Sequence, residues 1–199
     1  MIICLPKRSK HSLEGNVMDV DVTSHGTTYK GLSPFFLGPY TAPDGRIAQN
    51  MENLWQYSKV YPEHIGLYEN VTKKWIEWSN AGFESRKAER YPMGKGAVPK
   101  FSVWGYKRLS YIEARKHIYI PAYATLVLQS KLWREFKESA NQAEHVIIRD
   151  FDVYNHHVLN MGWEDVVNDP DRKCGHGFIL AMLLEYEEYL LNIVENWKK

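Results

Sequence analysis

The chain has little of what marks an extracellular, membrane or zinc-binding protein. Only two of its 199 residues are cysteines, Cys4 and Cys174, and they form no CxxC or CxxH spacing, so neither a disulfide framework nor zinc is expected. No apolar run approaches the roughly 18 residues of a membrane span. The first six residues have no basic flank before their apolar run, unlike a signal peptide. These absences favour a cytoplasmic location and no membrane partner.

Net charge is nearly absent as well. The 25 Lys and Arg residues balance 24 Asp and Glu, for a formal charge of +1. This balance gives no whole-chain argument for a nucleic-acid partner, although a local basic patch stays open. The hydrophobic fraction is 44%, which is enough for a real core. With no repeat, linker or low-complexity segment, residues 1–199 are predicted to form a single domain.

The residue patterns predict an α+β fold, a mostly helical domain with a small sheet. Runs rich in β-branched residues predict strands at 1–5, 17–23 and 145–154. Apolar periodicity predicts helices at 50–61, 68–80, 81–90 and 178–197, and one that starts at a capping box, Ser110 to Glu113, and continues to about 139 with a kink at Pro121. Most turn formers fall in 24–49, which is expected to be a long packed loop with at most one strand, near 27–30.

Residues 50–61 carry the most informative pattern. On a helix, Glu52, Gln56 and Lys59 fall on one narrow polar stripe, because each residue advances about 100°. Trp55 lies close to that stripe. An acid, an amide, an amine and an indole at one place suit a polar small molecule, whereas most stripes of this kind are solvated helix faces.

Two carboxylates, Asp150 and Asp152, stand at the end of the predicted apolar strand and alternate onto one face. Strand ends often carry site residues in α/β-type folds, and paired carboxylates can supply a general acid or base. Capping of a following turn is the equally simple alternative. His145, His156 and His157 lie nearby, but adjacent residues of an extended chain point apart, so no metal is expected.

Two glycine-bearing segments can offer backbone N–H groups to a phosphate. Gly94 and Gly96 lie in a lysine-bearing loop at 92–100, and the alternative there is an ordinary surface loop. Gly175 and Gly177 precede the last predicted helix, where the alternative is a plain N-cap turn.

The order of these features carries a resemblance. A Phe/Pro-rich segment, a helix with Glu and Lys seven residues apart, an acidic strand end and a glycine-bearing helix start follow one another at 32–39, 50–61, 149–152 and 175–184. This order resembles the NADAR superfamily of NAD- and ADP-ribose-associated proteins over about residues 30–185. The chain departs from the family pattern at Asn53, where His is usual, and at His176, where Asn or Lys is common. Gln56 is one position off the usual Gln, and the late motif lacks its second Gly.

The resemblance implies a NADAR-like fold and an N-glycosidase that acts on an ADP-ribosyl or other ribosyl-nucleotide bond. It implies Lys59 as a nucleophile if burial keeps its amine neutral, Glu52 as a proton carrier, and Asp152 as a group that stabilises the cation or activates water. No cofactor is implied. The remaining expected contacts to a nucleotide or an ADP-ribosylated base are Trp55, Gln56, Gly94, Gly96, Asp150, Gly175, His176 and an aromatic residue, either Trp104 or Tyr111. The alternatives are a nucleotide-binding module without turnover and a structural protein.

Overall fold

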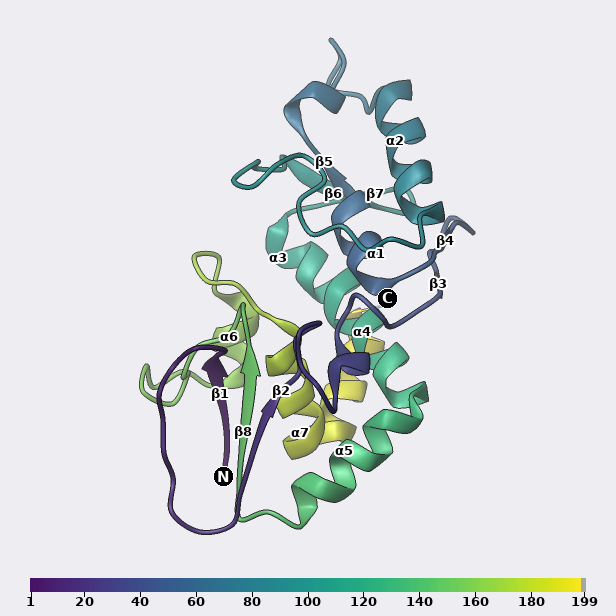
Figure 1. Cartoon of the computed structure of the whole chain (residues 1–199). Helices are drawn as coiled ribbons and strands as arrows, with labels where there is room; N and C mark the ends of the chain where they lie inside the picture. The colour runs from purple at the N-terminus through teal and green to yellow at the C-terminus, as the bar shows by residue number, and fades with distance from the viewer. Residues whose placement is uncertain (198–199) are drawn as a thin grey trace. The chain divides into compact units, whose positions relative to one another are not determined.

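The structure is a computed structural model that describes residues 1–197. Helices and several small sheets confirm the α+β class (Figure 1). The chain divides into two units. Unit 1 is formed by residues 1–33 together with the chain from residue 123 onward, and unit 2 by residues 34–122. The single domain over 1–199 stays a prediction, and residues 198 and 199 lie outside the described chain.

Unit 1 contains a three-stranded parallel sheet. Strand β8 (His145–Asp150) lies between β1 (Ile2–Pro6) and β2 (Val17–Asp21), as Figure 1 shows. The three predicted strands are confirmed, but β8 ends at Asp150, four residues earlier than expected. Ile3, Leu5 and Ile147 form a buried cluster on this sheet. The carboxyl ends of all three strands therefore meet at one edge.

Besides residues 123–129, which continue a helix of unit 2, unit 1 contains three helices and a short turn. They are α5 (Lys131–Asn141), α6 (Trp163–Asn168), α7 (His176–Trp197) and the 3-10 turn η1 (Lys30–Leu32). The apolar first turns of α7, residues 178–183, are buried, and α7 packs against β1 and β8. Tyr186 has non-helical φ and ψ angles of −144° and 49°, so α7 is kinked there. Helix α6 has no counterpart among the predicted elements.

The predicted long helix is segmented differently from the expectation. The capping box is confirmed, because Ser110 N–H donates to the Glu113 carboxylate at 2.8 Å and Glu113 N–H donates to the Ser110 hydroxyl at 3.4 Å. Helix α3 (Tyr111–Ala114) then continues through a π-helical turn, η3 (Arg115–Tyr119), into α4 (Ile120–Gln129). The break comes at Ser130 rather than Pro121. Pro121 directly follows the π-helical turn η3, in which the Ile120 N–H donates to the Arg115 carbonyl, so the regular i→i−4 ladder is already interrupted before the proline.

Besides α3, η3 and the first residues of α4, unit 2 contains two further helices and two small antiparallel sheets. The helices are α1 (Met51–Tyr57) and α2 (Lys73–Glu84), with a 3-10 turn, η2 (Pro62–His64). The sheets are the hairpin β3 (Tyr40–Thr41) and β4 (Ile47–Ala48), and the order β5 (Lys59–Val60), β6 (Phe101–Trp104), β7 (Lys107–Leu109).

Several predictions for unit 2 are wrong in position. The first helix ends at Tyr57 instead of 61, because Lys59 pairs with Ser102 as part of a sheet. The second runs over Lys73–Glu84 rather than 68–80, and no helix covers 85–90. The expected loop at 24–49 holds η1, β3 and β4 and has no strand at 27–30.

Candidate functional site

Helix α1 begins where its sequence predicts, and the Phe/Pro-rich segment holds its first turn. Asn50 caps the helix, since its side-chain oxygen accepts from Asn53 N–H at 2.8 Å. Met51 N–H donates to the carbonyl of Leu37, and Glu52 N–H donates to the carbonyl of Pro34, at 2.8 and 2.9 Å. These bonds satisfy backbone donors that a helix start leaves without an intrahelical partner, and they fix the position of Glu52.

A connected row of hydrogen bonds links the three polar residues of the predicted stripe. Gln56 Nε2 donates to Glu52 Oε1 at 2.8 Å, and Lys59 Nζ donates to Gln56 Oε1 at 2.7 Å. Glu52 and Gln56 are only 6% and 7% exposed. The stripe is therefore not a solvated helix face. Because the two ends of the Gln56 amide face different partners, the network also fixes which end is oxygen.

Lys59 reaches this network from outside the helix. It is the first residue of β5 and pairs with Ser102 of β6. Ser58 is the C-cap of α1 and keeps helical φ and ψ angles of −75° and −17°, so Lys59 Nζ still comes within 2.7 Å of Gln56. The predicted convergence of Glu52, Gln56 and Lys59 is thus found, although the helix that was expected to produce it is two turns long.

An aromatic group borders the amine. Lys59 Nζ lies 4.6 Å from the ring centre of Trp55, within range of a cation–π interaction. The Trp55 ring is 5.0 Å from that of Tyr119 and 6.4 Å from that of Tyr111. Trp104 instead stacks on Tyr40 at 6.4 Å. Of the two candidates for the family aromatic residue, Tyr111 is the one beside Trp55.

Tyr119 and Arg115 were missed by sequence reasoning. Tyr111, Arg115 and Tyr119 are spaced by four, and this spacing along a helix places residues on one face; it is the signal that was available. The Arg115 guanidinium lies 4.7 Å from the Tyr111 ring centre, and Arg115 is 1% exposed. A π-helical turn often marks a functional site, and η3 carries both missed residues.

Asn53, which stands where the NADAR pattern usually has His, stabilises the fold around α1. It is fully buried, and its Nδ2 faces the carbonyls of Gly82, Ser85 and Lys87 at 2.9–3.0 Å. Its Oδ1 accepts from Glu89 N–H at 2.9 Å. Asn53 therefore anchors the chain that follows α2 onto α1.

In unit 1, Asp150 and His176 form a buried pair at the carboxyl end of the parallel sheet. His176 Nδ1 lies 3.1 Å from Asp150 Oδ2, and the residues are 6% and 3% exposed. His176 Nε2 lies 2.9 Å from the Val22 carbonyl. Burial by itself acts to raise the pKa of Asp150, but the charge and hydrogen bond of His176 and the N–H groups of Phe151 and Gly177 lower the pKa below its ordinary value.

The N–H groups at the start of α7 are engaged within the protein. Gly177 N–H donates to Asp150 Oδ2 at 3.2 Å, and Gly175 N–H donates to the Asp152 carbonyl at 2.8 Å. A Cβ on Gly175 would meet Asp150 Oδ2 at 2.3 Å. The Asp150 carboxylate thus takes the position in which a phosphate was expected. Asp152 is less buried and pairs with Lys173 at 3.0 Å.

Gly94 and Gly96 form exposed turns. Their φ angles are +89° and +93°, and a Cβ on either would meet nothing within 4 Å. This geometry needs glycine for the backbone conformation and fits the alternative of a surface loop as well as it fits a phosphate cradle.

The histidines near β8 were considered as metal ligands in the sequence. Among residues 1–197, no group of three His, Cys, Asp or Glu side chains is arranged to hold a metal ion. His156 is 2% exposed and stacks between His157 and Trp163, with ring centres at 4.0 and 4.1 Å. Burial, and then the charge of His157, lower the pKa of His156 to about 4.

The sites of the two units are described separately: Glu52, Gln56, Lys59, Trp55 and Tyr111 belong to unit 2, and Asp150, Asp152, Gly175 and His176 to unit 1. In the described chain no helix is both long and apolar enough to cross a bilayer. Residues 7–162 match the model of a family of unknown function, DUF6939. No curated protein and no solved structure matches the chain.

Proposed function

The chain belongs to the DUF6939 family, and we propose that this member is an N-glycosidase that cleaves a ribosyl-nucleotide N-glycosidic bond, such as one that joins ADP-ribose to a nucleobase. The observation that carries the proposal is the hydrogen-bonded row Glu52, Gln56, Lys59 beside Trp55. The resemblance to the NADAR superfamily supports the same reaction.

The chemistry needs an acid, a nucleophile and a surface for a planar base. The bond between the anomeric carbon and the base nitrogen breaks as the Lys59 amine forms a new bond to that carbon. The base leaves with the bonding electron pair and a proton. The lysine nitrogen loses a proton on bond formation, and Glu52 transfers it to the base. Ring opening of the sugar then gives an imine, and water hydrolyses it to free sugar and free amine.

The other residues of unit 2 have supporting roles in this proposal. Gln56 holds the acid and the amine in register because it bonds to both. Trp55 and Tyr111 offer aromatic faces for a base. The role that the resemblance implies for Asp152, a residue of unit 1, stays a prediction. We also propose a cytoplasmic location, which the low cysteine content of two in 199 residues supports.

The test is release of base from an ADP-ribosylated guanine nucleoside, followed by chromatography and mass spectrometry. Borohydride added during turnover is expected to trap the sugar on Lys59, because reduction fixes an imine. Lys59→Ala and Lys59→Arg are expected to abolish release, since a guanidinium stays charged. Lys73→Ala, which changes an exposed lysine of the same unit, is the matched control.

Three results would separate the alternatives. Unchanged release by Lys59→Ala would eliminate the covalent route. Lost release without a trapped adduct would leave Lys59 as a positioning group. Thermal stabilisation by the nucleoside without any release would show a binding module instead of an enzyme.

A further inference from the structure

We propose that residues 86–108 of unit 2 form a surface that binds single-stranded nucleic acid. This stretch has seven basic residues and one acidic residue, Glu89. The basic residues are Arg86, Lys87, Arg90, Lys95, Lys100, Lys107 and Arg108. The chain's 25 basic and 24 acidic residues leave 18 basic and 23 acidic outside the stretch. The segment therefore carries an excess of positive charge, whereas the rest of the chain has an excess of negative charge.

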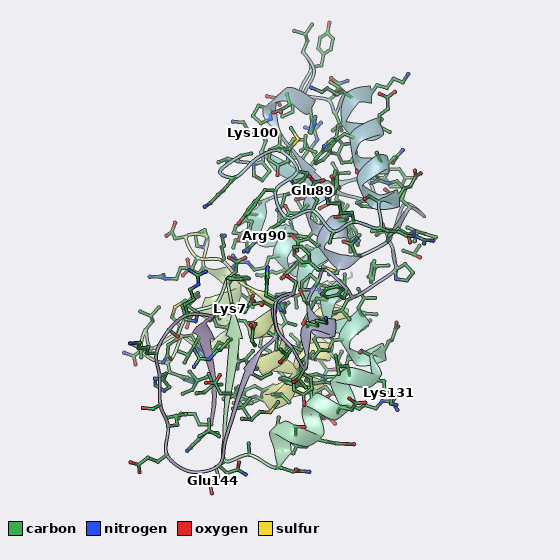
Figure 2. All side chains as sticks on the ribbon, viewed as in Figure 1. Lys7, Glu89, Arg90, Lys100, Lys131 and Glu144 are labelled. Atoms are coloured by element: carbon green, nitrogen blue, oxygen red, sulfur yellow. The ribbon has the colours of Figure 1, made fainter. Side chains whose placement is uncertain are left out.

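The cations of this segment face solvent. All of them except Arg90 are exposed, and Arg90 is half-buried. Arg90 and Lys100, labelled in Figure 2, both belong to the segment 85–100 that leads from α2 to β6. Between them, Gly94 and Gly96 turn the chain on both sides of Lys95. Glu89, the one acidic residue, accepts a hydrogen bond from the Tyr57 hydroxyl at 2.7 Å.

Exposed aromatic rings lie among the cations. Tyr106, in the turn between β6 and β7, is completely exposed, and Tyr91 is 41% exposed. The Arg90 guanidinium lies 5.3 Å from the Tyr91 ring centre, and that of Arg108 lies 4.8 Å from the Phe101 ring centre. Both tyrosines therefore present ring surface to solvent, Tyr106 entirely and Tyr91 in part. Rings and guanidinium planes are the groups on which unpaired bases stack.

The combination favours a single strand over other anionic partners. Cations alone accept any polyanion, but exposed rings gain contacts only from bases that are unstacked and accessible. A duplex keeps its bases stacked inside. A membrane-surface segment would need an amphipathic helix, whereas 86–108 contains turns and two short strands. The surface uses none of Glu52, Gln56 and Lys59, so it stands independently of the proposed reaction.

The experiment measures binding of the full chain to a fluorescein-labelled 20-nucleotide single strand by fluorescence anisotropy at several salt concentrations. Affinity is expected to fall with salt, with each phosphate contact adding about −0.7 to the logarithmic slope. Lys95→Glu with Lys100→Glu is expected to weaken binding at least tenfold. Lys131→Glu with Arg134→Glu makes the same charge change at exposed positions of α5 and is expected to change affinity less than threefold.

A second double variant separates the contribution of the aromatic rings to binding from that of the charges. Tyr91→Ala with Tyr106→Ala is expected to weaken single-strand binding at least threefold and to leave binding to heparin, which has no bases, unchanged. Lys59→Ala is expected to bind the strand normally, so loss of turnover and loss of this surface are distinguishable. The proposal is overturned if the wild-type chain does not bind the strand, or if the control charge pair weakens it equally. Tighter binding to a duplex, or to vesicles containing phosphatidylserine, also overturns it.

Discussion

The imidazole of His176 and the carboxylate of Asp150 lie 3.1 Å apart in the interior of unit 1. The pair joins the carboxyl end of β8 to the start of α7, and His176 also reaches the end of β2 through the Val22 carbonyl. Both nitrogens of the ring face acceptors, so the geometry suits a protonated imidazole beside a charged carboxylate. The carboxylate offsets the cost of burying a charged imidazole, and the imidazole offsets the cost of burying the carboxylate.

Removal of the carboxylate is expected to destabilise the protein strongly. Asp150→Leu leaves His176 without its counter-charge and the N–H groups of Phe151 and Gly177 without their acceptor, at a cost of roughly 3–5 kcal/mol in unfolding free energy. Urea unfolding followed by circular dichroism measures it. The control is Glu77→Gln in the exposed pair with Lys73, where the change is expected to stay below about 1 kcal/mol. Equal losses in both variants would contradict a special role for the pair.

The Asp150 carboxylate also makes the free energy of unfolding depend on pH. The pKa of Asp150 is lowered in the folded state, so its contribution is complete above the ordinary Asp value of about 3.9 and is lost as pH falls through the folded pKa. Asp150→Asn is therefore expected to be less stable than wild type by a constant amount above about pH 5, with the gap closing as the pH falls below the ordinary Asp pKa of about 3.9. Urea midpoints over this pH series are the measurement. A gap that widens on acidification would mean that the pKa is raised instead.

Local chemistry made part of this structure predictable. The β-branched runs gave the three strands of unit 1, and the Ser-x-x-Glu pattern gave the capping box before α3. The polar stripe correctly grouped Glu52, Gln56 and Lys59. These features depend on residues within a few positions of one another, so the sequence contains the information that determines them.

The errors have non-local causes. Helix α1 stops at Tyr57 because Lys59 pairs with Ser102, which lies more than forty residues away. The N–H groups of Gly175 and Gly177 were expected to be available to a phosphate. In the folded chain they donate to the Asp152 carbonyl and the Asp150 carboxylate. The choice between Trp104 and Tyr111 was left open, because spacing does not tell which of the two rings lies near Trp55. Such pairings cannot be read from spacing alone.

Loss of the Asn53 amide N–H donors is expected to destabilise the protein. In Asn53→Asp, a buried carboxylate would face the carbonyls of Gly82, Ser85 and Lys87, which we expect to cost about 3 kcal/mol or more. The matched control is Asn80→Asp, because the Asn80 oxygen accepts a hydrogen bond from Arg46 and a carboxylate can do the same. Thermal and urea unfolding of the two variants give the comparison. Similar stability of both would show that the Asn53 contacts add little.

Gly82 is expected to be intolerant of even one methyl group. It lies in α2, and a Cβ there would come within 2.0 Å of the Tyr57 ring. That ring packs on Trp78 at 4.5 Å and is held through its hydroxyl by Glu89, so we expect Gly82→Ala to cost about 2 kcal/mol or more. Gly162→Ala is the control, since its Cβ meets only a side-chain oxygen at 3.6 Å. An unchanged urea midpoint for Gly82→Ala would show that Tyr57 moves freely.

Gln56 gives the sharpest test of the proposed site, because a single atom change reverses its role. In Gln56→Glu the donor that now faces Glu52 at 2.8 Å becomes a second carboxylate oxygen. Two carboxylates this close cannot both ionise easily, so one keeps a proton at neutral pH. The new carboxylate also holds Lys59 as an ammonium ion through a charge-assisted contact, and an ammonium ion cannot attack the anomeric carbon. We therefore expect kcat for base release to fall by about 100-fold or more, with a smaller change in KM and a pH–rate profile displaced toward higher pH.

Gln142→Glu makes the same substitution at an exposed position after α5 and is expected to leave the rate and its pH profile unchanged. A rate for Gln56→Glu within threefold of wild type would mean that the hydrogen-bonded row is structural and that the amine and the acid act without it.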